Sequence, residues 1–498
     1  MRIGKMKCMA LLAVTALLAP MHADAASLSL QQAIDMALAQ NTSLRVTQEA
    51  EEKASAELSQ AKGDKGVSVS ASGDVDASHS LHSNSKSGLS GNLSVGLPLY
   101  SGGKLENAIK SGELGVVSAM MDTERERQEL RYNVIKAYYD ALESRKTVGV
   151  RQESVDNFQA HLTNVEQLYA AGAKARIDVL RSSVELSDAK QDLIKAKNSY
   201  EVNLATLRNL LDMNREEPLT LTDDVVYVPF GHQLPSCVSY AMDHRRDILV
   251  DEYKVRQREL AVDTAKAGFR PSINASAGTN WSASLRPERD LDSSRGFSGG
   301  ITAKWNIFDS GVTKAKVREA ESDLRTAGLN LKKSREDIDL SVRQSYFNMR
   351  EAEERMNSTQ HAVNEAREDY NIARESYRAG EDILLDVIDA QLALSKAELN
   401  YITAQYDYAR YKAQVESNMG VPLTESEMRA AGASIARDDR TNDEILKGGV
   451  RRAEATVDAS KDVTSQKTVE KAESKVTPAD TSAAAVADEA AANGGAQG

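Results

Sequence analysis

The chain has 498 residues, of which 27% are charged and 5% are aromatic, and its formal net charge is −12. This composition is typical of long helices with narrow apolar stripes rather than of compact domains with thick cores. The negative charge also argues against nucleic acid as a partner, because phosphate backbones attract surfaces rich in Lys and Arg.

The first 25 residues have the pattern of a secretory signal peptide. Basic residues precede a short apolar run, and an Ala-Asp-Ala cleavage pattern ends at Ala25. The run is too short for a membrane-spanning helix, which takes about 20 apolar residues. We therefore expect an exported chain that begins near Ala26 and has no transmembrane helix. Cys237 is the one cysteine outside the signal, so no internal disulfide is expected.

Residues 26–213 predict a helix, a β-hairpin and two further helices, in that order. The first helix extends to about Lys62, with apolar residues at helical spacing. Residues 67–100 then alternate apolar or glycine positions with polar ones, as two strands around a polar loop do. From Lys104 to about Ala171 a heptad seam runs without any proline. At 1.5 Å per residue this helix would be on the order of 100 Å long.

The same order of elements then occurs a second time. A shorter helix returns after Gly172, and residues 236–424 repeat the whole series, with the second hairpin at 271–308 and a second turn at Gly380. From the second strand of each hairpin onward, matched positions lie 208 residues apart, as Gly172 and Gly380 do. A constant shift over such a length indicates an internal duplication.

Two stretches lie outside the repeats. Residues 214–235 contain three prolines and predict a linker, in which residues 225–230 (VVYVPF) resemble a short edge strand. Residues 425–498 are dominated by Ala, Glu, Lys, Asp, Thr and Ser and contain no aromatic residue. We therefore expect a largely disordered tail, because such a segment cannot bury enough apolar surface to order itself.

The strands of both hairpins are long enough to cross a bilayer, since a tilted transmembrane strand needs about 9–11 residues. One face is apolar or glycine, and both tryptophans, Trp281 and Trp305, lie on it. Four strands cannot close a barrel, and open edges in lipid cost several kcal/mol for each unpaired backbone group. We therefore expect several copies to share one barrel. A soluble two-stranded ribbon packed on a helix is the alternative.

Several motifs together resemble the TolC family of outer-membrane efflux and secretion channels. They are the two hairpins, the two heptad helices, LPLYSGG at 97–103 with WNIFDSG at 305–311, and YRAGEDILLDVIDAQ at 377–391. The resemblance covers about residues 27–425. It implies a mostly α fold with transmembrane β-strands, in which a homotrimer shares a 12-stranded barrel in the outer-membrane lipid of a Gram-negative cell. The long coiled-coil helices would continue it as a periplasmic α-barrel.

The resemblance further implies partners and cargo. A periplasmic adaptor and an inner-membrane transporter, either ATP-driven (ABC) or proton-driven, would dock at the helical tips. The assembly would export drugs, other small molecules or polypeptides, the last by type I secretion. The docking positions would be the two hairpin turns, at Gly172 and Gly380, together with Asp178. Both glycines are expected to take left-handed backbone.

By the same resemblance, Asp386 and Asp389 would line the constriction of the tunnel. A trimer would bring six carboxylates around one axis, which raises their pKa values and favours cations. Without the resemblance, these aspartates are most simply solvated charges near a helix start. Asp178 is the first-copy counterpart of Asp386, but Arg181 occupies the position of Asp389, so the first-copy hairpin is expected to be less acidic.

A latch is the last feature that the resemblance implies. Tyr377 matches a tyrosine that ties the closed hairpins together, and Asp382 stands where the family has an arginine. The candidates to replace that arginine are Arg374, Arg378 and Lys174. We expect opening to untwist the second-copy hairpin against the rest of the chain.

Enzymatic chemistry is not expected. No phosphate-binding, zinc-protease or paired Cys/His motif occurs, and His79 and His82 are most simply solvated loop residues. We therefore predict no catalytic residue, cofactor or metal. A secreted coiled-coil stalk or adhesin is the rival from another class, although it gives no role to the duplicated strands. A periplasmic adaptor is a weaker rival, because it normally has one coiled-coil hairpin and no membrane strands.

Overall fold

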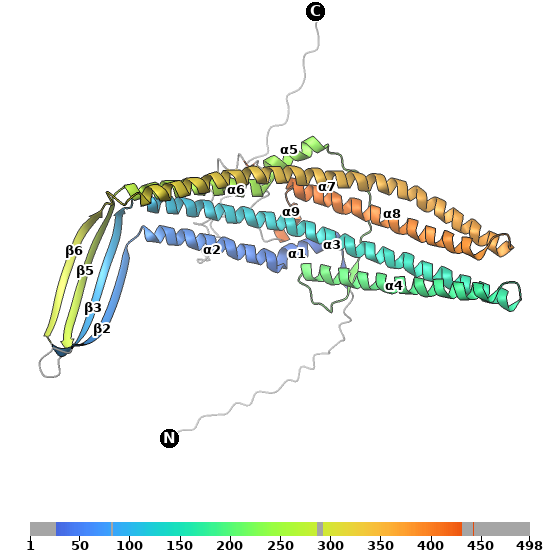
Figure 1. Cartoon of the computed structure of the whole chain (residues 1–498), viewed down its shortest axis with the longest axis horizontal. Coiled ribbons are helices and arrows are strands. Elements are labelled where there is room, and N and C mark those ends of the chain that lie inside the picture. The colour runs from blue at the N-terminus through green and yellow to red at the C-terminus, as the bar shows by residue number, and fades with distance from the viewer. Residues whose placement is uncertain (1–25, 81–82, 286–291, 431–441, 443–498) are drawn as a thin grey trace, which may run out of the picture.

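The computed structural model describes residues 26–80, 83–285, 292–430 and 442. Figure 1 shows an elongated molecule with a β-sheet at one end and two helical hairpin tips at the other. The predicted signal peptide, most of the predicted tail and His82 lie outside the described residues. Among the helices of the described part, none has both the length and the apolar character that a membrane span requires.

The sheet has four antiparallel strands, and both predicted hairpins are present in it. The strands pair in the order β2-β3-β5-β6, so the hairpins join through β3 and β5. Leu93 lies opposite Thr279 at this junction, which places the apolar faces of the two hairpins on the same side. The outer edges of the sheet are β2 and β6. The strands are β2 (Ser68–Ser80), β3 (Ser83–Tyr100), β5 (Ser272–Leu285) and β6 (Asp292–Lys304).

Each strand is connected to one helix, and the helices keep the order of the strands (Figure 1). Neighbouring helices next to the sheet pack in the order α2-α3-α6-α7. The result is a wall one helix thick. The helices are α2 (Thr42–Asp64), α3 (Lys104–Ala170), α6 (Arg246–Lys266) and α7 (Val312–Ala379), and the short 3-10 helix η1 (Ala267–Phe269) links α6 to β5.

Two of these helices run the whole length of the helical part. The 67 residues of α3 and the 68 of α7 agree with the heptad prediction. Away from the sheet, the return helices α4 (Arg176–Leu210) and α8 (Leu384–Met419) take the places of α2 and α6, and the order becomes α4-α3-α8-α7. Buried apolar residues form separate clusters along the length, one in the middle and another between the hairpin tips.

The first helix of each repeat is broken, which corrects the single helix predicted to Lys62. The side-chain nitrogen of Asn41, at the first break, donates to the carbonyl oxygen of Leu210 at 2.9 Å. Arg245, at the second break, donates to the carbonyl oxygen of Asn418 at 3.3 Å. Leu210 and Asn418 are matched positions, so each break is fixed to the end of its own return helix. The additional helices are α1 (Leu30–Gln40) and α5 (Leu234–His244).

The linker also differs from its prediction. Residues 225–230 form no strand, and two side chains donate to the carbonyl oxygen of Val228. The hydroxyl of Tyr408, for example, donates to the carbonyl oxygen of Val228 at 2.9 Å. The short strand of this region is β4 (Leu219–Leu221), which pairs in parallel with β1 (Ala26–Leu28).

The predicted start of the disordered tail, at residue 425, is too early. Residues 425–430 form α9 (Glu425–Ala430), which packs on α1. Glu427 is 1% exposed and accepts an ion pair from Arg131 of α3 at 2.6 Å. Asn442 is also buried, and its side-chain nitrogen donates to the carbonyl oxygen of Arg245 at 2.9 Å. An ion pair and the burial of Met428 in the apolar cluster in the middle of the molecule therefore hold α9, and six residues are too few for a helical pattern to be recognised in the sequence.

Candidate functional site at the helical tips

The two turns at the tips have the backbone that was predicted. Gly172 has φ of +73° and Gly380 has φ of +80°, both in the left-handed region that side chains other than glycine rarely adopt. The carboxylate of Asp178 then accepts from the backbone nitrogen of Ala175 at 3.3 Å, and that of Asp386 from Ile383 at 3.4 Å. Both aspartates therefore bind the N-terminus of a return helix.

The predicted gate residues lie on the exposed side of α8. Asp386 and Asp389 are exposed, whereas Val387 and Ile388 between them are buried against the other hairpin. Asp389 lies near Glu185 of α4, and partial burial together with the carboxylates of Asp188 and Asp389 raises the pKa of Glu185. One chain thus brings acidic groups from both hairpins together, where the sequence suggested a less acidic first hairpin.

Glu185 and Asp188 were not predicted, because neither has an acidic counterpart in the second copy. Their matched positions in the second copy are Ala393 and Lys396, so the acidic character of the first hairpin lies about one turn further along its helix. Extending the comparison by two helical turns would have found both residues.

Tyr377 lies at the centre of the contact between the hairpins and is 2% exposed. The Nζ of Lys174 lies 4.2 Å from the centroid of its ring, and the imidazole of His161 lies 5.4 Å away, centroid to centroid. Arg378 instead pairs with Glu375 at 3.0 Å. The structure therefore places Lys174 rather than Arg378 on the tyrosine, in a cation–π contact rather than an ion pair.

The other two latch candidates lie away from this contact. Arg374 pairs with Glu375 at 3.3 Å, and its guanidinium lies over the ring of Tyr370 rather than that of Tyr377. Asp382 makes no side-chain hydrogen bond or ion pair with any described residue. Neither residue therefore joins the two hairpins in this structure.

Several buried polar atoms at the tips have no hydrogen-bond partner among the described residues. Leaving a buried polar group unpaired costs roughly 1–3 kcal/mol, so native structures avoid it. The five atoms come from all four tip helices, and water would reach them if the hairpins separated. They are His161 Nε2, Ser182 Oγ, Tyr377 Oη, Gln391 Oε1 and Ser395 Oγ.

We expect His161 to make the contact between the tips dependent on pH. Burial lowers the pKa of its imidazole below the ordinary value of 6.5, so contact between the hairpins favours the neutral ring. Separation exposes the ring and returns its pKa to the ordinary value. As the pH falls below about 6.5, the separated form therefore gains a proton first, and the closed form loses stability down to the lowered pKa.

We expect amide hydrogen exchange at the start of α8 to become faster at pH 5.5 than at pH 7.5, after correction for the intrinsic exchange rate. His161→Phe should remove this difference, because the ring is kept and the titrating nitrogen is lost. Protonation of Glu185, whose pKa is raised by burial and by its acidic neighbours, acts in the opposite direction at lower pH. An unchanged pH response in the variant would contradict the role of His161.

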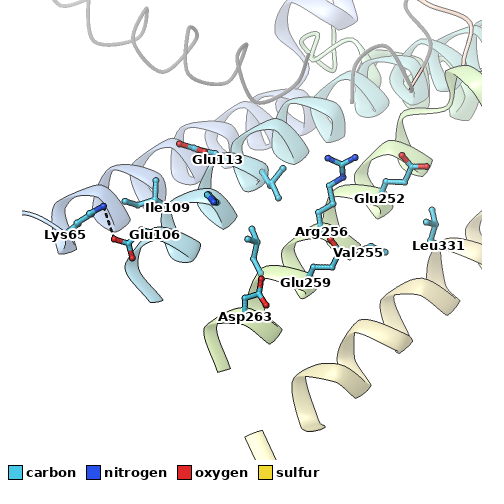
Figure 2. A pocket seen from close by; sticks show the side chains of 13 residues that line it. Lys65, Glu106, Ile109, Glu113, Glu252, Val255, Arg256, Glu259, Asp263 and Leu331 are labelled. Atoms are coloured by element: carbon cyan, nitrogen blue, oxygen red, sulfur yellow. Dashed lines mark ion pairs between the residues drawn. The ribbon is translucent and has the colours of Figure 1, made fainter. Parts of the chain in front are cut away.

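A groove of about 970 Å³ lies nearer the sheet (Figure 2). Charged side chains of α3 and α6, together with Lys65 just after α2, surround it, among them the ion pair of Lys65 with Glu106 at 3.0 Å. Ile109 and Val255 supply part of its apolar lining. Within the described residues, no group of three or more His, Cys, Asp or Glu side chains is placed to hold a metal ion. We assign no ligand to this groove.

Sequence comparisons with known proteins agree on one family. The chain matches the family described as "Outer membrane efflux protein" over residues 33–212 and 237–421, which coincide with the two repeats. It is 25% identical to outer membrane protein TolC of Salmonella enteritidis over 175 residues, which are 35% of each chain. It is 26% identical to the alkaline protease secretion protein AprF of Pseudomonas aeruginosa over 337 residues, 64% of this chain and 68% of that one.

A solved structure has the same fold. The CmeC outer membrane channel of Campylobacter jejuni superposes with a TM-score of 0.69 at 16% identity, over 84% of this chain and 89% of that one. The alignment with TolC spans about a third of that protein's length, so its activity and partners do not transfer directly.

Proposed function

Because this chain belongs to the outer membrane efflux protein family, we propose that it is an outer-membrane channel that exports small molecules or polypeptides across the periplasm and the outer membrane. The observation that carries this proposal is that the strands of the sheet and the helices connected to them follow the same order, in a wall that is one helix thick. Such a wall has two free edges, and copies of the chain can join at these edges to enclose a conduit.

The internal duplication supports a definite way of joining the strands. Within the chain, Leu93 of β3 lies opposite Thr279 of β5. The matched strands between copies are β6 of one chain and β2 of the next. Matched positions that follow the hairpin loops differ by 208 residues. Those that precede the loops differ by 204 residues, as Asn41 and Arg245 do. If β6 of one copy pairs with β2 of the next as β3 pairs with β5 within the chain, Ile301 lies opposite Val75 of the neighbour.

The helical edges support the same arrangement. Leu180 of α4 is 53% exposed, whereas its counterpart Ile388 is 6% exposed in the contact between the hairpins. Phe347 of α7 is 59% exposed, whereas its counterpart Tyr139 is half-buried and packs on the central cluster. A contact of α7 with α4 of the next copy would cover both residues. Family relationship then favours three copies, with twelve strands in one barrel.

The tips would be the periplasmic gate and docking surface. In this proposal Asp386 and Asp389 line the constriction, and Tyr377 with Lys174 holds the hairpins closed. The turns at Gly172 and Gly380 would face a periplasmic adaptor and an inner-membrane transporter. The name of AprF describes secretion of a protease, which supports including polypeptides among the cargo classes.

Conductance in planar lipid bilayers tests the proposal. We expect the purified protein to form channels that divalent cations block from the periplasmic side. The double variant Asp386→Ala/Asp389→Ala should weaken this block by roughly tenfold or more, since about 1.4 kcal/mol of lost attraction is a factor of ten.

A matched control distinguishes the loss of constriction charge from the loss of a helix cap as the cause of weaker block. Asp178 binds its own helix start with nearly the same geometry as Asp386, at 3.3 Å against 3.4 Å. Asp178→Ala should therefore leave the block unchanged. A wild-type protein that forms no channels would remove the proposed function, and block that persists in the double variant would remove the gate assignment.

The secreted stalk is the alternative function, and the family match does not favour it. Membrane fractionation distinguishes the two. A trimer recovered in outer-membrane vesicles fits the channel, whereas a soluble fibrous species in the medium fits the stalk.

A further inference from the structure

The apolar face of the four-stranded sheet carries one charged side chain among the described residues. It is Arg295 of β6, which is exposed and lies on the same face as Phe297, since side chains two apart on a strand point to one side. No carboxylate of the described residues forms an ion pair with Arg295. The other charged side chains described on these strands lie on the polar face, and they are Asp74, Asp76 and Lys304.

Arg295 lies where a membrane-spanning sheet would meet one surface of the bilayer. β6 begins at the end of the sheet that is far from the helices (Figure 1), and Ser293, a polar residue, is the next residue on this face towards that end. At the other end Trp305, ten residues along the chain from Arg295, is 59% exposed, as an interfacial aromatic would be. Ten strand residues cover about 33 Å, or about 25 Å across the bilayer at a tilt of about 40°. This is about the height of the apolar band of a transmembrane barrel, so Arg295 and Trp305 would lie at its two borders.

A tryptophan lies beside the arginine. Trp281 of β5 is directly opposite Arg295 in the antiparallel pairing. Residues in such positions have Cβ atoms about 4.5–5.5 Å apart, so one ligand can contact both side chains. On its other side, the indole of Trp281 covers Gly91 of β3, because a Cβ on that glycine would lie 3.8 Å from Cε3 of the ring. An aromatic ring packed on the sheet and an exposed guanidinium are therefore neighbours at this border.

The internal duplication shows that the fold does not require this pair. Matched positions are 204 residues apart before the hairpin loops and 208 after them, so the counterparts of Trp281 and Arg295 are Ala77 and Ser87. Ala77 and Ser87 also lie opposite each other, in the pairing of β2 with β3. One hairpin thus has two small residues at the place where the other has tryptophan and arginine. The Trp281–Arg295 pair therefore serves something other than the pairing of strands.

The chemistry of the pair matches a lipid phosphate. An arginine on a lipid-facing surface is costly at the centre of the bilayer and tolerated near its surfaces, where the headgroups lie. Its planar fork donates two parallel hydrogen bonds to a phosphate. The indole of tryptophan suits the same depth, because its apolar body contacts acyl chains while its N–H faces the headgroups. Phe297, which is 83% exposed, lies two residues nearer the centre on the same face and offers a surface for acyl chains.

We propose that Trp281 and Arg295 form a binding site for the phosphorylated glycolipid of the outer leaflet, with the guanidinium on a phosphate and the acyl chains along Phe297. The site rests on the proposed function, which places the sheet in the outer membrane and the helices in the periplasm. The end of the sheet that carries Arg295 then lies in the outer leaflet, where this glycolipid rather than a phospholipid is the main lipid. Each chain has one Trp281–Arg295 pair and so one site.

Native mass spectrometry of the full-length protein in detergent, freed of lipid and titrated with diphosphoryl lipid A, tests the site. We expect one molecule per chain whose binding depends on Arg295. Arg295→Gln should weaken this binding at least about tenfold, because the charge-assisted hydrogen bonds to the phosphate are lost. Lys304→Gln is the matched control, because it removes a positive charge from the polar face of the same strand, and it should leave the binding unchanged. Equal affinity of wild type and Arg295→Gln would overturn the proposal.

Two further lipids identify the group that is recognised. Wild type and Arg295→Gln should bind dephosphorylated lipid A equally, because the arginine then has no phosphate to contact. Phosphatidylglycerol should bind more weakly than diphosphoryl lipid A, because a phosphodiester carries a single charge whereas a phosphomonoester carries about −1.5 to −2 at pH 7. Phosphatidylglycerol that binds as tightly, with the same dependence on Arg295, would overturn the glycolipid as the ligand.

The first hairpin allows the pair to be added at a second place. The double variant Ala77→Trp/Ser87→Arg should bind two molecules of diphosphoryl lipid A per chain. In the proposed assembly the counterpart of Gly91 is Gly299 of the neighbouring copy, which would lie opposite position 77 and could be covered by the new indole. This variant keeps the native site, so it also tests the proposal if Arg295→Gln fails to fold. A count that stays at one per chain would overturn the proposal.

The binding measurement is independent of conductance, so the site and the channel can fail separately. A conducting protein whose lipid binding does not depend on Arg295 would overturn the site and retain the channel. A protein that shows the Arg295-dependent binding and forms no channels would retain the site and remove the channel.

Discussion

A chain with cysteines at Val75 and Ile301 should form a covalent trimer in outer membranes after mild oxidation or treatment with a short thiol-bridging reagent. The two side chains lie on the edge strands β2 and β6, on the apolar face, and are 75% and 70% exposed in the single chain. Residues directly opposite in antiparallel strands have Cβ atoms about 4.5–5.5 Å apart, which is within reach of such a link. Denaturing electrophoresis reads the result as a change from monomer to trimer.

The register is tested by a second pair. Phe297 is four residues from Ile301 on the same face, so at about 3.3 Å per residue its distance from Val75 would be on the order of 13 Å. Val75→Cys with Phe297→Cys should therefore stay monomeric, as should each single variant. Cys237 is buried and gives no background link. Linking through Phe297 instead of Ile301 would contradict the register, and linking through neither would contradict the shared sheet.

Arg131→Met should lower the free energy of unfolding of the helical part by about 3–5 kcal/mol, the range observed when one partner of a buried ion pair is removed. Glu427 is 1% exposed, and besides Arg131 it accepts a hydrogen bond from the hydroxyl of Thr424 at 2.7 Å. Without the arginine, a carboxylate taken out of water keeps only neutral donors. Urea unfolding followed by circular dichroism measures the loss.

Lys53→Met provides the matched comparison for this effect. Lys53 pairs with Glu57 at 3.8 Å, and both side chains are well exposed, at 76% and 62%. Such a pair contributes about 0.3–0.5 kcal/mol, so the variant should unfold almost as wild type does. Equal midpoints for the two variants would mean that α9 is not part of the cooperative unit.

The order and type of the long elements could be predicted from the sequence, because they depend on the periodic spacing of apolar residues. The alternation of residues 67–100 and the heptad seam of residues 104–171 each extend over enough residues to give the type of element and nearly its bounds. The constant shift between matched positions then gave the duplication. The turn glycines could be predicted for a related reason, since their backbone requirement is local.

The features that could not be predicted depend on contacts between segments that are distant in the sequence. The break at Asn41 interrupts no apolar pattern, and its reason, a bond to Leu210, is visible only in the fold. Lys174 could not be preferred over Arg378 from spacing, because the choice depends on how two hairpins meet. Glu185 of the first repeat faces Asp389 of the second across that same contact, where no sequence period applies.

The two-repeat chain has a thermodynamic consequence for assembly. A ring of six single-repeat subunits would need five associations, each of which loses translational and rotational freedom worth about 4–15 kcal/mol. Three chains that each contain two repeats need only two associations. In the proposed trimer, the covalent connection through residues 214–235 thus replaces half of the joints by peptide bonds. Because the joint within a chain and the joint between chains need not then be identical, the ion pairs of Arg410 with Asp140 and Glu143 can stabilise the first joint without being repeated at the second.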